Sequence, residues 1–225
     1  AMTGARFLVL EDSEFALTGA DIEGSHPRWR SFVAKVGEEI RLQEMRAGVW
    51  SYLAVAGGFA VEKWFGSASV NARAGFGTVC SIGGELPAWT PTRFAAIAGR
   101  FMRPEDVPGF SEEAAISVWP GPEWDWLSGD SMSDFLRQPW TLSPHCDRTG
   151  YRLKGPELKM PAKRMLSAPL SIGTVQLPPG GDPIVILRDG PTVGGYPRLA
   201  ILDPSAVSRF TQRAPGTTVR FRLQK

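Results

Sequence analysis

The segment 189–197, with the sequence DGPTVGGYP, combines residue types that together can hold an amide or a carboxylate. Asp189 supplies an acceptor or a base, and the phenol of Tyr196 supplies a donor. Gly194 and Gly195 can adopt positive φ and present backbone N–H groups to a ligand. We therefore interpret Asp189 and Tyr196 as candidate catalytic residues and the two glycines as candidate substrate-binding residues. A tight turn whose glycines serve only its geometry is the competing interpretation.

Further polar residues occur in the same half of the chain. Gln176 stands among apolar neighbours in VQLPP, and a buried carboxamide must be hydrogen-bonded, either to nearby backbone or to a ligand amide. The stretch DRTGYRL places the guanidinium groups of Arg148 and Arg152 near the ring of Tyr151. Guanidinium groups suit a carboxylate or a phosphate, so Arg148, Tyr151 and Arg152 are candidate substrate-binding residues. Gln176 is a further candidate for substrate binding. An ion pair between Arg148 and the adjacent Asp147 is the competing interpretation.

Small polar side chains also follow a glycine in the first half of the chain. Ser67, Ser69 and Asn71 in GSASVN are candidate substrate-binding residues. Side chains of this kind after a turn commonly cap backbone groups instead, and that alternative stays open. Glu123 in PGPE supplies a carboxylate near the expected junction of two domains, and we leave its role open.

Several catalytic signatures are missing from the sequence. There is no GxxxxGK[ST] phosphate loop, no CxxC pair and no closely spaced histidines, so we predict no metal site in this chain. His145, Cys146 and Asp147 are adjacent, but neighbours in an extended chain point to opposite faces. We therefore interpret Cys146 as an incidental loop thiol and not as a nucleophile.

Short apolar runs punctuated by glycine and proline dominate the chain. They predict strands over 6–10, 15–18, 39–43, 50–56, 116–119, 151–153, 173–177, 184–187, 198–202 and 217–223. Helices are predicted over 131–138 and 203–212, with a weaker helical turn over 91–98. The second helix has Asp203 as its N-cap and Pro204 at its first position. This pattern is typical of a mainly β protein with barrels or sandwiches.

Composition limits the class of protein. The 225 residues carry 25 Lys and Arg against 23 Asp and Glu, which argues against a nucleic-acid or membrane-surface protein because both need clustered positive charge. Two cysteines form no secreted disulfide framework, and no apolar run is long enough to span a bilayer. We expect a cytoplasmic protein with reduced thiols. The polar, proline-containing stretch 100–113 predicts two domains, 1–105 and 106–225.

The chain contains six segments whose order and spacing resemble the family of the 5-oxoprolinase C subunit. They are SYLAVAGGF, FGSAS, WPGPE, DRTGYRLKGPEL, GTVQLPPGGDPIVILRDGPTVGGYPRLA and PGTTVRF. The same module occurs as allophanate hydrolase subunit 2 and in the carboxyltransferase region of biotin-dependent urea carboxylases. The resemblance implies two cyclophilin-like β-barrel domains with a few short helices. Family members usually begin with a segment carrying VQDGGR-like and GAMD-like motifs that this sequence does not contain, so the first barrel is expected to be incomplete.

The resemblance also implies partners and chemistry. In the 5-oxoprolinase form, the protein acts with the enzyme's B subunit, which resembles allophanate hydrolase subunit 1, and with a third subunit. ATP bound by the complex then drives hydrolysis of 5-oxo-L-proline to L-glutamate. In the carboxylase form, carboxybiotin on a partner polypeptide transfers its carboxyl group to urea or a related amide. Both substrates are planar amides whose oxygen needs donors as it becomes anionic.

On this resemblance we predict a subunit of an ATP-dependent 5-oxoprolinase, an amidohydrolase that hydrolyses the lactam 5-oxo-L-proline to L-glutamate and is active only with its B subunit. Two alternatives remain at the level of the sequence. One is the carboxyltransferase component of a biotin-dependent urea or amide carboxylase, or a subunit associated with allophanate hydrolase. The other is a non-catalytic regulatory protein that binds a B subunit homologue of the kinase-inhibitor type.

Overall fold

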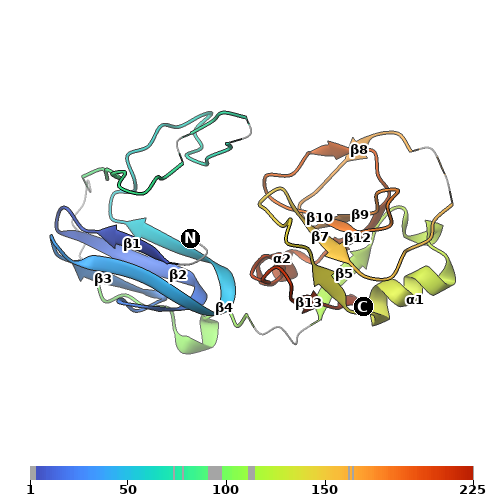
Figure 1. Cartoon of the computed structure of the whole chain (residues 1–225), viewed down its shortest axis with the longest axis horizontal. Coiled ribbons are helices and arrows are strands. Elements are labelled where there is room, and N and C mark those ends of the chain that lie inside the picture. Colours follow the sequence, from blue (N-terminus) through green and yellow to red (C-terminus); the bar gives the residue numbers. More distant parts are fainter. Residues whose placement is uncertain are drawn as a thin grey trace. The chain divides into compact units, whose positions relative to one another are not determined.

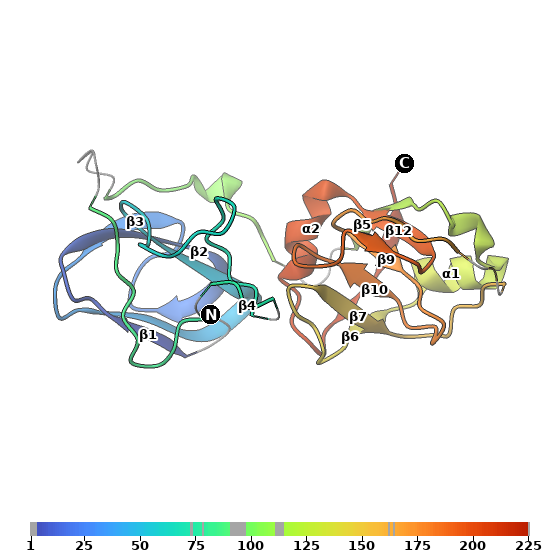
Figure 2. The same ribbon diagram turned by 90° about the horizontal axis from the view of Figure 1, so that it is seen from above.

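The chain divides into two compact units, Ala1–Pro108 and Gly109–Lys225, and each contains its own strands and its own buried apolar side chains. A computed structural model describes residues 4–72, 74–77, 79–90, 98–110, 115–161, 163 and 165–224. Strands predominate over helices in both views of the chain (Figures 1 and 2), which agrees with the mainly β fold predicted from the sequence.

The first unit is built on one four-stranded antiparallel sheet with the strand order β1-β4-β2-β3. Its strands are β1 (Ala5–Leu8), β2 (Ser13–Gly24), β3 (Arg30–Ala34) and β4 (Glu39–Val55). The apolar cluster of this unit buries Leu17, Ala20 and Ile40 completely. The two strands predicted over 39–43 and 50–56 are a single strand, β4, which pairs with β1 along its first part and with β2 along most of its length.

Strand β4 continues through its polar middle because its pairing with β2 shifts register between Gly19 and Asp21 and again before Gly24. Gly19 has a φ of +95°, and a Cβ at this position would lie 2.2 Å from the carbonyl oxygen of Trp50. Such bulges bend and twist a strand without ending it. The polar residues that interrupt the sequence pattern therefore lie inside the strand.

The second unit is a nearly closed β-barrel with the strand order β13-β6-β7-β10-β9-β12-β5-β14. Its strands are β5 (Ile116–Pro120), β6 (Trp140–Leu142), β7 (Gly150–Lys154), β9 (Thr174–Gln176), β10 (Ile184–Ile186), β12 (Arg198–Leu202), β13 (Thr218–Val219) and β14 (Phe221–Leu223). β13 and β14 stand at opposite ends of this order although only Arg220 separates them in sequence. The two edges of the sheet must therefore curl toward each other, as in a barrel.

Aromatic side chains and two short helices complete the second unit. Phe135 of α1 (Gly129–Arg137) stacks on Phe221 with ring centroids 4.8 Å apart. Trp140 is fully buried and donates its indole N–H to the carbonyl oxygen of Phe135 at 3.1 Å. Helix α2 (Pro204–Thr211) begins after Asp203, whose carboxylate accepts the backbone N–H of Ser205, so the predicted N-cap is confirmed.

Both longer predicted helices are present, with ends that differ by one or two residues from those expected. The weaker helical turn predicted over 91–98 falls almost entirely on residues outside the described part of the chain. Within the described part, neither α-helix is long and apolar enough to cross a membrane.

Candidate functional site

The loop Val193–Pro197, hereafter the glycine loop, joins a small two-stranded sheet to the barrel of the second unit. The small sheet pairs β11 (Val193–Gly194) with β8 (Ala168–Pro169), and β8 lies above β9 and β10 in Figure 1. The loop enters the barrel at Arg198, which faces Gln176 in the pairing of β12 with β9. Tyr196 is 45% exposed, so its ring is open to solvent or to a ligand.

Gln176 supports the glycine loop from the barrel side. Its side chain is buried, and its Nε2 atom donates to the carbonyl oxygen of Tyr196 at 3.1 Å. Of the two alternatives left open by the sequence, the structure shows the one in which the carboxamide satisfies neighbouring backbone. Direct contact between Gln176 and a substrate stays a prediction.

Gly194 and Gly195 of the loop differ in how much space surrounds them. Neither has a positive φ, so the expectation that they adopt this conformation is wrong. Gly194 is the more crowded of the two, because a Cβ there would lie 2.8 Å from Nε2 of Gln176 and 2.8 Å from Cδ1 of Leu170, and both side-chain ends would have to shift. A Cβ on Gly195 would meet only Oγ of Ser167, at an ordinary 3.6 Å. An added methyl group therefore meets side chains at Gly194, whereas Gly195 is exposed and has room for one.

Arg198 anchors the end of the loop through a buried ion pair with Glu123. The Nε atom donates to Oε2 of Glu123 at 2.9 Å and Nη2 donates to Oε1 at 2.8 Å, and the backbone N–H of Arg198 also donates to Oε2 at 2.9 Å. The side chains of Arg198 and Glu123 are only 19% and 10% exposed, respectively. Such bidentate, charge-assisted contacts are among the strongest hydrogen bonds in proteins.

The ion pair depends on a close approach of two backbone segments. Gly121 donates its N–H to the carbonyl oxygen of Leu199 at 2.7 Å, and a Cβ on Gly121 would lie 2.1 Å from the carbonyl oxygen of Arg198. This glycine therefore lets the PGPE segment bring Glu123 against β12. Hydrogen bonds from Arg198 lower the pKa of Glu123 below its ordinary value, and burial opposes this effect only in part. The carboxylate in turn raises the pKa of Arg198.

Arg148 and Asp189, predicted separately as binding and catalytic residues, form an ion pair with each other. Nε of Arg148 lies 2.9 Å from Oδ2 of Asp189, and Nη2 donates to Oδ1 at 3.1 Å. The expected alternative pair of Arg148 with Asp147 is wrong, because the Asp147 carboxylate accepts the backbone N–H groups of Thr149 and Gly150. The Arg148 side chain is 49% exposed, so this pair, unlike that of Glu123, is accessible to a ligand.

Tyr151 and Arg152 lie on opposite faces of β7, as consecutive strand residues do. Tyr151 is 2% exposed, packs on Phe210, and donates its hydroxyl to the carbonyl oxygen of Thr211 at 2.8 Å. It is a core residue whose ring and hydroxyl both make contacts inside the unit, so its burial gives no support to substrate binding, which stays a prediction. Arg152 is exposed, and its role in binding stays a prediction.

The thiol of Cys146 and the polar residues of the first unit have local roles. Cys146 donates to the carbonyl oxygen of Arg152, and burial raises the pKa of its thiol, which disfavours the nucleophilic thiolate. Ser67 accepts the backbone N–H of Ser69, and Asn71 accepts that of Ala74. The structure thus shows Ser67 and Asn71 in the capping roles left open by the sequence, and substrate binding by Ser67, Ser69 and Asn71 stays a prediction.

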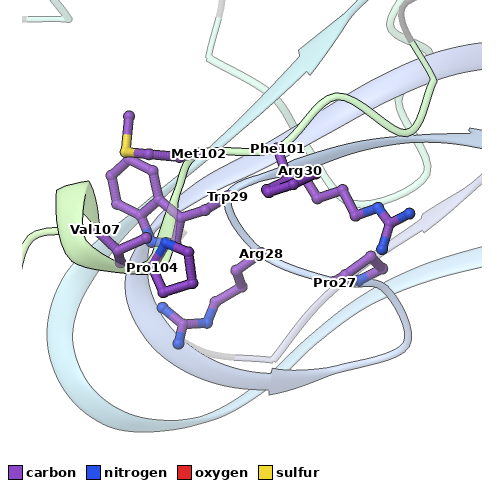
Figure 3. Close-up of a pocket in the computed structure, with 8 residues that line it drawn as sticks. All are labelled: Pro27, Arg28, Trp29, Arg30, Phe101, Met102, Pro104 and Val107. Carbon is purple, nitrogen blue, oxygen red and sulfur yellow. The ribbon is translucent and has the colours of Figure 1, made fainter.

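The first unit contains an open hollow of about 530 Å³, drawn in Figure 3. Trp29, Phe101 and Met102 supply much of its apolar lining, and the guanidinium groups of Arg28 and Arg30 point in different directions. Arg28 is moreover paired with Asp21 at 2.7 Å. The hollow thus lacks the few converging polar groups that fix a small ligand. Among the described residues, no three His, Cys, Asp or Glu side chains gather as a metal site would require.

Comparison with known proteins identifies a family that matches this chain. The family described as "Carboxyltransferase domain, subdomain A and B" matches residues 1–223. The C subunit of 5-oxoprolinase from Escherichia coli (strain K12) is 34% identical over 220 residues, which cover 93% of this chain and 69% of that protein. The urea amidolyase of Saccharomyces cerevisiae is 24% identical over 245 residues, which cover 98% of this chain and 13% of that protein.

Solved structures of two proteins share the fold of this chain. A crystal structure of TTHA0988 superposes with a TM-score of 0.81 at 30% identity, covering 99% of this chain and 44% of that chain. The urea carboxylase of Kluyveromyces lactis superposes with a TM-score of 0.85 at 21% identity, covering 99% of this chain and 22% of that chain. The chain thus spans less than half the length of either of these two solved chains.

The packing around the glycine loop predicts different effects of an added methyl group at its two glycines. Gly194→Ala should lower the free energy of unfolding by about 1–3 kcal/mol, because its Cβ must displace Gln176 and Leu170. Gly195→Ala should change it by less than about 0.5 kcal/mol. Urea unfolding followed by tryptophan fluorescence measures both variants, and equal effects at the two positions would contradict this packing.

The Glu123–Arg198 pair predicts a specific dependence of stability on pH. Glu123→Gln should lower the free energy of unfolding at neutral pH by about 1–3 kcal/mol. Since the pKa of Glu123 is lower in the folded than in the unfolded state, its contribution is complete above the unfolded value of about 4.3. The contribution is lost as pH falls through the folded value, so the difference from the parent should shrink in acid.

Urea unfolding between about pH 7 and about pH 3 measures this difference. The matched control is Asp182→Asn, which removes the carboxylate of an exposed pair with Lys154 and should have little effect. A difference between Glu123→Gln and the parent that stays constant down to the lowest pH would refute the assignment.

Proposed function

The chain belongs to the family of carboxyltransferase domains with subdomains A and B, and from this premise we propose that it is the C subunit of an ATP-dependent 5-oxoprolinase. The observation that carries the proposal is its similarity to the C subunit of the E. coli enzyme across almost its entire length. We propose further that it acts in the cytoplasm with the B subunit of such an enzyme as its partner, together with a third subunit.

The reaction proposed is hydrolysis of a five-membered lactam. One water adds to the lactam carbonyl carbon, the C–N bond breaks, and the nitrogen takes up a proton. A second water is consumed as ATP becomes ADP and phosphate. The lactam oxygen gains negative charge on the way, so donors aimed at it lower the barrier. The exposed glycine loop offers such donors in the backbone N–H of Gly195 and the hydroxyl of Tyr196.

Arg148 and Asp189 suit the other end of the substrate. The lactam carries a carboxylate, and Arg148 already holds a carboxylate in bidentate fashion at a half-exposed position. When the substrate carboxylate takes this place, Asp189 is released and becomes free to accept a proton from the attacking water. The ion pair would then act as a resting state that substrate binding opens.

ATP and the remaining groups belong to the complex in this proposal. The sequence of this chain has no GxxxxGK[ST] phosphate loop, so we assign the nucleotide to the assembled complex and not to this chain alone. The glycine loop contributes donors, and the partner contributes the rest of the active site around the lactam.

Reconstitution tests this function. The purified chain, its B subunit partner and the third subunit from the same source are assayed alone and together for glutamate released from 5-oxo-L-proline and ATP. We expect turnover only from the mixture. Asp189→Asn should lower that turnover at least about 100-fold, the order of effect of removing a general base. Asp182→Asn is the matched control and should leave turnover unchanged.

Other outcomes distinguish the alternatives. Turnover by the isolated chain would contradict the shared site, and full turnover by Asp189→Asn would remove Asp189 from the mechanism. The urea amidolyase and urea carboxylase relatives favour carboxyltransfer as the second candidate function. Co-purification with a biotinylated polypeptide, detected with streptavidin, together with no glutamate release, would support that function. Tight binding to the B subunit without any turnover would indicate a regulatory protein.

A further inference from the structure

We infer that Glu123, acting through Arg198, is a positioning residue that holds the glycine loop in its reactive shape. The local sequence around either residue gives no sign of this role. The effect on loop shape follows from the contacts in the second unit. The effect on catalysis rests on the proposed function. The effect on loop shape and the effect on catalysis are tested by separate measurements.

One set of contacts links Glu123 to the first half of the loop. Glu123 fixes the guanidinium of Arg198 with two side-chain hydrogen bonds, and Nη1 of Arg198 donates to the carbonyl oxygen of Pro169 at 3.3 Å. Pro169 lies in β8, directly opposite Val193 of β11. Arg198 thus links β8 to Glu123 in the PGPE segment. Since β8 pairs with β11, this link restrains the start of the glycine loop.

A second set of contacts reaches the other half of the loop. Glu123 accepts the backbone N–H of Arg198 at 2.9 Å, which fixes the chain where the loop re-enters the barrel. Arg198 faces Gln176 across the β12–β9 pairing, and Gln176 donates to the carbonyl oxygen of Tyr196. One carboxylate therefore restrains both ends of a short loop whose middle carries Gly195 and Tyr196.

Burial of the Glu123 and Arg198 side chains limits the motion of the ion pair that restrains the glycine loop. The Glu123 and Arg198 side chains are 10% and 19% exposed, against 25% and 49% for Asp189 and Arg148. Screening by water is weaker for the buried pair, and its planar bidentate geometry leaves little freedom to swing. A misplacement of about 1 Å at reacting groups costs about 100-fold in rate, so a stiff anchor at this point matters for catalysis.

The three tyrosines of the chain make the loop shape measurable without any activity. Labelling with 3-fluorotyrosine gives one fluorine resonance each for Tyr52, Tyr151 and Tyr196, assigned by tyrosine-to-phenylalanine variants. Tyr151 reports on the core of the second unit and Tyr52 on the first unit. In Glu123→Gln we expect the Tyr196 resonance to shift or broaden while those of Tyr151 and Tyr52 stay in place.

A second variant separates positioning from stability. Glu123→Leu combined with Arg198→Met replaces the pair by apolar groups of similar size, an exchange that often preserves stability. The exchange also leaves the backbone N–H of residue 198 without the acceptor on Glu123, so we expect a somewhat lower unfolding midpoint but an unmoved Tyr151 resonance. We expect a displaced Tyr196 resonance, since the contact with Pro169 is lost. In the reconstituted complex, kcat of both variants should fall about 100-fold while KM changes less than about threefold. Asp182→Asn should leave spectrum and kinetics unchanged.

The outcomes are distinguishable. An unchanged Tyr196 resonance in both variants overturns the inference, and so does a Tyr151 resonance that moves together with that of Tyr196, because the pair would then serve only the core. If the parent complex releases no glutamate, the proposed function fails, and the fluorine spectra still decide whether Glu123 positions the loop.

Discussion

A buried carboxylate joined to a guanidinium, Glu123 to Arg198, is the contact on which the candidate site depends. It forms only because Gly121 lets two backbone segments approach closely, and it restrains β12 and β8 at the same time. Removing one charge from such a pair leaves the other buried without compensation, which is costly. The same pair that stabilises the second unit therefore also determines where the exposed part of the glycine loop lies.

Much of the fold follows from the sequence, because short alternating apolar runs bounded by glycine and proline specify a mainly β protein. Two details depend on pairing, which local pattern does not encode. Strand β4 runs through its polar middle because bulges in its pairing with β2 absorb the irregularity. The single run predicted over 217–223 divides at Arg220, since β13 pairs with β6 and β14 pairs in parallel with β5. Each half belongs to a different edge of the barrel.

The site is less predictable from the sequence, for physical reasons that differ between residues. Sequence adjacency suggests a partner for Arg148, but the fold supplies Asp189, 41 positions away. Tyr151 is of a residue type common in binding sites, yet its place on the inner face of β7 buries it. Gly194 does belong to the loop, but it has no positive φ, and a side chain there would crowd the ends of Gln176 and Leu170. Arg198 pairs with a residue 75 positions away, and no local signal indicates such a contact.

The second unit thus presents a barrel, a loop anchored by a buried ion pair, and a more exposed ion pair of Arg148 with Asp189, at which we propose that a substrate carboxylate binds. The most direct test is a crystal structure of the assembled complex with 5-oxo-L-proline bound. We predict the lactam oxygen within about 3.2 Å of the Gly195 N–H or the Tyr196 hydroxyl, at hydrogen-bond distance. A lactam bound away from the glycine loop, with that loop covered by a partner and closed to ligands, would contradict the proposed site.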